Sequence, residues 1–521
     1  MNRRREILII VLGILLVVSC IAAYEMHFRW KWAVESYKRQ LRAAGEKLTV
    51  EELVPPPIPP EQNSADTFRK AFFSWQGSNW DFNAFSKLNL PLPMQFIGPA
   101  KAFARAMQPR IDLRTTNAWA EADAAVGQRR DTLNLLQQII DRPAFDFRFD
   151  FKQGFLLESR ELIGMRDASL LLSGASVCDL HRGDTAAALL KIRAMLALTK
   201  GLEREPCLSS EQVRSGIISR SVGATWEFLQ SPGVTGEQLA TLQRDWSSLE
   251  SVQTLERAVE MERAANDGVL VDWRSSSSKF RAGLKRAFVN GSDEPSSAWF
   301  ELPQAAWRGT ILRVESGLWR FSWSYADELL ALKNYQTVLS AVRLAQTNRS
   351  LPPFQEEWKR MAEWHTEGQK NFWLLNFFAP ELHYFFAGCA HNAAYQFQRA
   401  EVNEVARQQV VAAIALKRYQ LKYGKYPPDL NSLVPEFISA VPLDVVDGQP
   451  LRYRRNADGT FLLYSIGGDG KDDGGNPGSA PYYSYLQSWL MARDRIYDWV
   501  WPQPATPEEI QAYYNRRKSG N

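Results

Sequence analysis

Residues 406–475 read ARQQVVAAIALKRYQLKYGKYPPDLNSLVPEFISAVPLDVVDGQPLRYRRNADGTFLLYSIGGDGKDDGG. The apolar residues at the start of this stretch recur with helical spacing and continue to Gly424, where a helix is expected to close on a left-handed residue. Pro427 prevents the helix from continuing. Two short runs of alternating residues, 451–454 and 461–465, flank an Asn-Ala-Asp-Gly turn, which is a β-hairpin signal. The stretch therefore predicts a small α+β module that ends in an acidic, glycine-rich loop.

Five spaced motifs in this module form a recognisable order. They are YGKYP (423–427), LNSLVP (430–435), PLD (442–444), GQPLRY (448–453) and DGTFLLYSIG (458–467). A long helix followed by these motifs resembles the globular head of the major pseudopilins of bacterial type II secretion. The resemblance covers roughly residues 400–476 and implies a pseudopilin-like α+β domain, which we expect at residues 397–480.

The resemblance also implies a metal. In that family the loop after the second strand binds calcium, so Asp469, Asp472 and Asp473 would be the ligands here, helped by backbone carbonyls. Calcium takes six to eight oxygen ligands, and three carboxylates are few for that number. The alternative, a solvated acidic turn, stays open.

Two departures separate the chain from a pilin. Pseudopilins begin with a processed glycine, followed by a phenylalanine and then a glutamate five residues along, whereas Arg3, Arg4, Arg5 and Glu6 precede the apolar run here. The head also lies far along the chain instead of directly after that run. The sequence therefore predicts a borrowed head domain and not a filament subunit.

The N-terminus predicts a membrane anchor. Residues 7–24 read ILIIVLGILLVVSCIAAY, and a helix of that length spans about 27 Å, close to the hydrocarbon thickness of a bilayer. Tyr24, Phe28 and Trp32 suit an interfacial aromatic belt. We expect residues 1–6 in the cytoplasm, a single-pass anchor at 7–24, and the bulk of the chain on the periplasmic side of a bacterial inner membrane.

A lipidated anchor is the alternative. The sequence before Cys20, Val-Val-Ser, matches a loose bacterial lipobox, which would make Cys20 the lipidated first residue. The apolar run continues past Cys20, as a spanning helix requires and a cleaved signal does not. Both alternatives tether the protein to a membrane.

Between anchor and head the chain predicts helices. Residues 25–61 are expected to form a helical stalk and a proline-rich linker, and residues 62–396 a large all-α domain. Thr235 and Gln238 form a capping-box pattern that places a helix start at residue 236. Residues 481–521 are expected to form an aromatic tail and a C-terminal helix. The predicted fold class is mainly α, with a transmembrane helix, an all-α ectodomain and a small α+β domain.

Composition and motifs restrict the function. The 521 residues carry a formal net charge of +4, which gives no reason to expect nucleic acid. The four cysteines are widely spaced without a CxxC pair, so a zinc site is not expected. No GxSxG, HExxH or P-loop motif occurs. We expect a non-enzymatic interaction or scaffold protein with envelope partners. The alternatives are a hydrolase with an active site in the helical domain and a calcium-independent scaffold of helical repeats.

Overall fold

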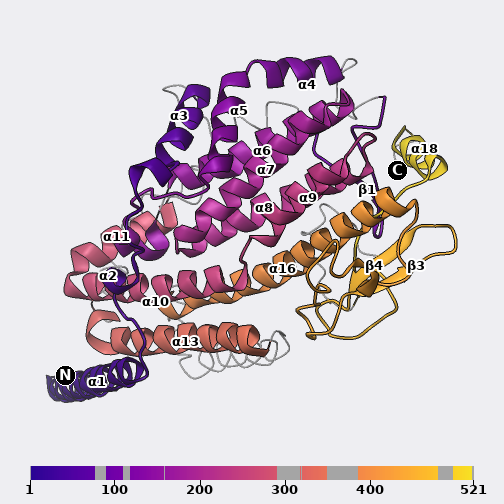
Figure 1. The fold of residues 1–521 in the computed structure, drawn as a ribbon. Coiled ribbons are helices and arrows are strands. Elements are labelled where there is room, and N and C mark those ends of the chain that lie inside the picture. The colour runs from indigo at the N-terminus through magenta and orange to yellow at the C-terminus, as the bar shows by residue number, and fades with distance from the viewer. Residues whose placement is uncertain are drawn as a thin grey trace.

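The computed structural model describes residues 2–76, 90–109, 118–157, 159–289, 317, 319–348, 385–478 and 497–518. The fold is mainly helical with small sheets, as the sequence predicts (Figure 1). The helices are α1 Asn2–Ala43, α2 Val50–Leu53, α3 Ala65–Gln76, α4 Ala118–Gly127, α5 Arg130–Gln137, α6 Arg160–His181, α7 Thr185–Gly201, α8 Leu208–Gln230, α9 Gly236–Ser247, α10 Val252–Ser275, α11 Ser277–Val289, α13 Ser324–Asn348, α16 Phe385–Tyr423 and α18 Pro507–Lys518. Short helical turns include η4 Phe151–Leu156, η6 Trp319–Trp323 and η8 Asn431–Leu433.

The described residues contain no helix that is both long enough and apolar enough to cross a membrane. Backbone of residues 7–24 belongs to α1. Most side chains of that segment, including Cys20, lie outside the described residues.

The main core lies among α6, α7, α8 and α9, which pack side by side (Figure 1). Local sequence signals set where these helices begin. The Ser159 hydroxyl caps α6 and the Asp184 carboxylate caps α7, each accepting a backbone N–H. The capping box of Thr235 and Gln238 is present at the start of α9, so that prediction is confirmed.

Two strands lie inside the region expected to be all-α, and that part of the prediction is wrong. Strands β1 Gln95–Gly98 and β2 Lys101–Phe103 form a short hairpin, and β6 Gln503–Pro504 pairs parallel to β2. The buried carboxylate of Glu227 on α8 holds this hairpin by accepting the backbone N–H groups of Met94, at 2.8 Å, and Ala106, at 2.6 Å. Such short strands carry too few residues for an alternating pattern, and one partner comes from the distant C-terminal tail.

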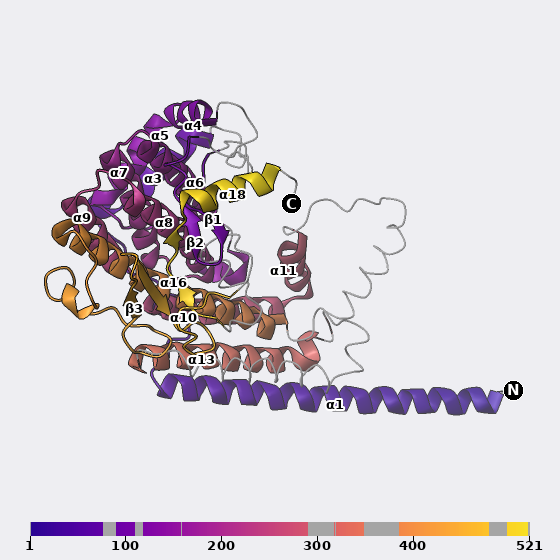
Figure 2. The same cartoon turned by 90° about the vertical axis from the view of Figure 1, so that its right-hand side faces the viewer.

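The segment expected to be a stalk is a packed part of the helical domain. The second half of α1 lies along α13 (Figure 2), with Val34 buried against Leu329 and Leu332. Lys38 ion-pairs with both Asp267, at 2.7 Å, and Glu328, at 2.6 Å. The helix that carries the predicted anchor is therefore fixed to the domain by buried contacts and charges.

The head is built on the second half of α16. Strands β3 Arg452–Arg455 and β4 Phe461–Ser465 form the predicted hairpin, and β5 Trp499–Val500 from the tail pairs antiparallel to β4. The tail also contacts the helical domain, because the Trp226 indole N–H on α8 donates to the carbonyl of Pro502 at 2.8 Å. Helix α16 packs on α13, α8 and α9 as well as on β4. One continuous helix thus belongs to both parts of the molecule.

Candidate functional site

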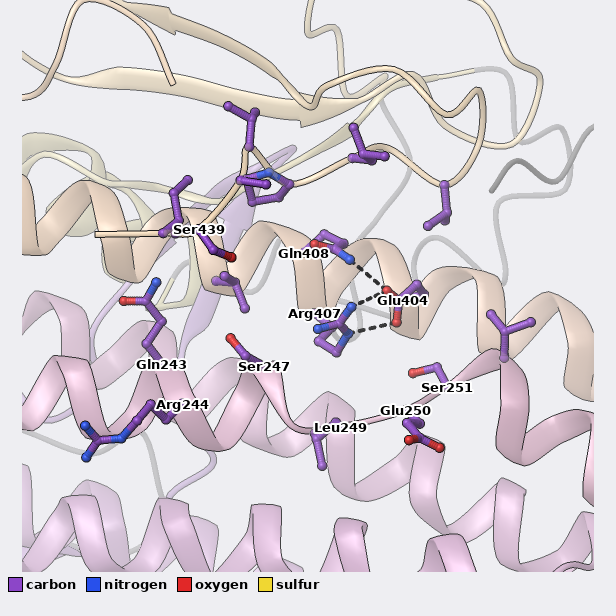
Figure 3. Close-up of a pocket in the computed structure, with 18 of the residues that line it drawn as sticks. Gln243, Arg244, Ser247, Leu249, Glu250, Ser251, Glu404, Arg407, Gln408 and Ser439 are labelled. Carbon is purple, nitrogen blue, oxygen red and sulfur yellow. Dashed lines mark hydrogen bonds and ion pairs between the residues drawn. The ribbon is translucent and has the colours of Figure 1, made fainter. Parts of the chain in front are cut away.

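A groove of about 800 Å³ lies where the head meets the helical domain. Its walls are the α9–α10 connection, the middle of α16 and the head segment 437–445 (Figure 3). We call it the junction groove. Its size falls in the range of ligand sites, which occur preferentially where domains meet.

At one end of the junction groove, hydrogen bonds join α9, α16 and the head segment. The Arg418 guanidinium on α16 donates to Gln243 Oε1 at 2.8 Å and to the carbonyl of Phe437 at 3.1 Å. The Gln243 amide in turn donates to the same Phe437 carbonyl at 2.9 Å. The head segment is therefore tied to both helices at this corner, and the Arg418 guanidinium also lies 5.3 Å from the centre of the Phe437 ring.

The same corner carries two positive charges close together. Burial lowers the pKa of Arg418; the Glu436 carboxylate opposes that shift, while the positive charge of Arg244 adds to it. Glu436 itself ion-pairs with Lys422. Among the described residues, Arg244 donates to the Thr241 hydroxyl, and neither Arg244 nor Arg418 forms an ion pair with a carboxylate. Arg244, Arg418 and Lys422 thus surround the carboxylate of Glu436, and the excess of positive charge at this corner favours a bound anion.

In the middle of the groove, the acidic side chains are paired with basic ones. Figure 3 shows Glu404 on α16 bonded to both Arg407 and Gln408. The Arg407 Nε lies 2.8 Å from Glu404 Oε2, and Gln408 Nε2 lies 2.8 Å from Glu404 Oε1. Glu250 on the opposite wall lies 3.6 Å from Arg257. The positive end at Arg244 and Arg418 therefore differs in charge from the rest of the groove.

On the head wall of the groove, several backbone N–H groups are available to bind a partner. Within the described chain, the N–H groups of Ser439, Ala440 and Val441 make no backbone hydrogen bond, although Pro442 beyond them accepts one from Leu451 at 3.0 Å. Ser439 and Ala440 are exposed. An extended peptide can pair with such groups, because main-chain hydrogen bonds supply affinity in strand-addition modes of recognition.

The acidic loop follows β4 and wraps around the carboxylate of Asp498, which was not predicted from the sequence. Asp498, which precedes β5, accepts the backbone N–H groups of Gly475 at 2.7 Å and of Asp473 and Asn476 at 3.3 Å. Burial raises the pKa of Asp498 to about 6. Gly467 in this loop has a φ of +69°, and a Cβ there would meet the Tyr497 carbonyl at 2.1 Å, so only glycine fits.

The three predicted ligands lie on this loop without converging. Asp469 accepts the Lys471 N–H at 3.1 Å. Asp472 accepts the Tyr464 hydroxyl at 3.0 Å, and its other oxygen lies 3.8 Å from Arg452. Asp473 contributes its backbone N–H to Asp498. In the described part of the chain no three His, Cys, Asp or Glu side chains are grouped as a metal site would require. Calcium binding stays a prediction with Asp469, Asp472 and Asp473 as its candidate ligands; Asp472 and Asp473 are exposed, and Asp469 is half-buried.

Carboxyl groups with raised pKa values lie elsewhere in the helical domain. Burial raises the pKa of Glu227 and of Glu262 to about 7, and that of Glu205 to about 8. Glu227 and Glu205 each accept backbone N–H groups, and Glu262 accepts the Asn266 amide at 3.3 Å. None of the three lines the junction groove. The hydrolase alternative stays a prediction.

A scan against protein-family models, a search of curated proteins and a search of solved structures each returned no match. The junction groove itself was not predicted from the sequence. Arg244 and Arg418 are far apart along the chain, and no motif connects them. The role of Asp498 could not be predicted from the sequence either, because this residue lies in the aromatic tail and reaches the acidic loop only through strand pairing.

Proposed function

We propose that this chain is a membrane-anchored, non-enzymatic protein of the bacterial envelope that binds an acidic, extended segment of a partner protein in the junction groove. The observation that carries the proposal is the pair of positive charges at Arg244 and Arg418, which line one end of the groove and form no ion pair within the part of the chain that the structure describes. A carboxylate of the partner would neutralise that end, and a bidentate arginine contact would add orientation.

The groove walls support an extended occupant. The free backbone groups of residues 439–441 run along one wall. The opposite walls include α9 and α16, whose buried faces belong to the main core. A preorganised site of this kind loses little conformational entropy on binding, which favours affinity.

The membrane part of the proposal rests on the apolar sequence of residues 7–24, whose length as a helix matches the hydrocarbon thickness of a bilayer. With that orientation the groove would face the periplasm, where an envelope protein could present its segment. The pseudopilin-like head, stabilised by calcium at its acidic loop, would serve as one wall of the binding site.

Site-specific photo-crosslinking tests the proposal. The full chain would carry benzoylphenylalanine at Ser439, and the cells that produce it would be irradiated. We expect one discrete partner that crosslinks through a segment containing Asp, Glu or a C-terminal carboxylate. A synthetic peptide of that segment should bind the purified full chain, and the affinity should fall as the ionic strength rises.

Charge reversal supplies the control. Arg244→Glu should remove the crosslink and weaken peptide binding tenfold or more, because a favourable charge becomes repulsive. Lys70→Glu, which is also a charge reversal but at an exposed residue on α3, should leave the crosslink and the peptide affinity unchanged. Crosslinking that survives Arg244→Glu, or a crosslinked segment without any carboxylate, would refute the proposal.

A further inference from the structure

An exposed aromatic ring lies beside the helix that carries the predicted anchor. Phe321, in η6, is 63% exposed, whereas Trp319 in the same turn is 1% exposed. Arg320 fixes the turn to the end of α10, with Nε 2.7 Å from the Arg274 carbonyl and Nη1 2.9 Å from the Ser277 hydroxyl. On the other side of Phe321, the Ser324 hydroxyl accepts the Arg274 Nε–H at 3.0 Å, so the turn is anchored on both sides of the exposed ring.

The direction of α1 and α13 places this turn at the membrane-facing end of the domain. The His27 ring packs edge-on against Tyr325 at 5.0 Å, and further along Glu46 ion-pairs with Arg343. The residue numbers at these contacts therefore increase in the same direction along both helices, so α1 and α13 run parallel. Because η6 immediately precedes α13, it lies at the end from which the first half of α1 projects (Figure 2).

The depth of Phe321 along α1 matches the predicted bilayer interface. Tyr24, the last residue of the apolar run, and Phe28 after it are 63% and 48% exposed, with ring centres 4.5 Å apart. They are one helical turn apart, about 6 Å along the axis, comparable to the roughly 5–8 Å of one headgroup layer. Since η6 packs on α1 and Tyr325 meets His27, Phe321 lies at this same level.

The charges near the turn fit the same layer. Arg29 and Lys31 are exposed on α1, and the Arg320 guanidinium lies 5.3 Å from the centre of the Phe321 ring. Basic residues near a bilayer surface are attracted to anionic headgroups, and aromatic rings concentrate at that depth.

We infer that Phe321 and its turn η6 form a second contact with the lipid bilayer, separate from the spanning helix, in which the Phe321 ring inserts among the phospholipid headgroups. This inference rests on the proposed membrane anchor and adds to it an orientation. A single helix leaves a domain free to rotate and tilt on the surface. A second contact from a different element holds the domain, and with it the junction groove, at a set orientation.

Lipid photo-crosslinking of the full chain tests the inference. The chain would be reconstituted in vesicles of phosphatidylethanolamine and phosphatidylglycerol, with benzoylphenylalanine replacing one residue at a time. The probe positions are Phe321, Phe73 and Ile10. Phe73 is the matched control, since it is 56% exposed on α3, away from α1 (Figure 1). Ile10 is 61% exposed within the predicted span and reports on the anchor itself. Lipid adducts would be quantified by mass spectrometry of the protein.

We expect adducts at Phe321 and Ile10, each severalfold above the amount at Phe73. Adducts at Ile10 together with a Phe321 signal no higher than that of Phe73 would overturn the second contact and leave the anchor in place. Adducts at Phe321 without any at Ile10 would support the surface contact and overturn the spanning anchor. Phospholipid adducts at neither position would overturn both.

Discussion

Replacing Glu262 by glutamine should change how the stability of the protein depends on pH. Glu262 is buried on α10 and accepts the Asn266 amide, with Cys207, Tyr335 and Cys389 as its titratable neighbours. Burial raises the pKa of Glu262 from 4.5 to about 7. The folded protein therefore binds this proton more tightly than the unfolded chain does.

The sign and size of the effect follow from that difference. The contribution of Glu262 to stability is fully present below about pH 4.5 and is lost as the pH rises through about 7. At about 1.4 kcal/mol per pKa unit, the loss reaches about 3 kcal/mol near pH 8. The Glu262→Gln variant cannot ionise, so it escapes this loss. Any cost of burying the extra amide N–H group is the same at every pH and shifts the whole curve without changing its slope.

The assay is urea unfolding of the full chain in nanodiscs, followed by tryptophan fluorescence at several values between about pH 5 and about pH 8. Relative to the wild type, Glu262→Gln should gain about 2–3 kcal/mol across that range. Glu237→Gln, at an exposed residue of α9, should follow the wild-type curve. Parallel curves for Glu262→Gln and the wild type would show that the buried carboxyl does not titrate in this window, and the reasoning would be wrong.

Three further predictions concern the anchor side of the domain, the tail and the acidic loop. Burial works to raise the pKa of Glu46, but hydrogen bonds from Arg343 and Arg263 lower it to about 2. Arg263→Met should therefore lower the free energy of unfolding in urea by about 3–5 kcal/mol, and adding Glu46→Gln to that variant should recover part of the lost stability. An unchanged urea midpoint of Arg263→Met would contradict the packing of this ion pair. Trp226→Phe removes the bond to Pro502 and should cost about 1 kcal/mol; proteolytic release of the tail should accelerate, and an unchanged release rate would count against tail docking. Calcium should raise the unfolding midpoint of the wild type and of Asp458→Asn, but not that of Asp472→Asn. Equal shifts in all three proteins would exclude Asp472 as a ligand. No shift in the wild type would exclude calcium binding and support the solvated acidic turn.

Local chemistry allowed the elements of the head to be predicted from the sequence. Gly424 closes α16 with a φ of +74°, as expected from the glycine and the prolines behind it. The hairpin strand 461–465 begins and ends where the alternating residues place it. These features depend on a few neighbouring residues, so one sequence is enough to predict them.

Features that depend on distant pairing could not be predicted. The third strand of the head, β5, comes from the tail, and its short length gives no periodic signal. The positive end of the junction groove depends on Arg244 of α9 and Arg418 of α16, which the fold brings within electrostatic range of each other. The acidic loop was predicted as a group of carboxylates, but the loop N–H groups turn inward to Asp498. Each case joins residues whose proximity the fold creates and the local sequence does not encode.

The continuous helix α16 has a consequence for how such a chain can change over time. An α-helix turns by about 100° per residue. Inserting or deleting one residue between its two halves would therefore rotate the head about the helix axis by that angle. The bond from Gln409 to the Trp499 carbonyl, at 2.6 Å, and the corner at Arg418 would then face away from their partners. Length changes in the loops of this protein should be tolerated, whereas the number of residues in α16 should be invariant among functional variants.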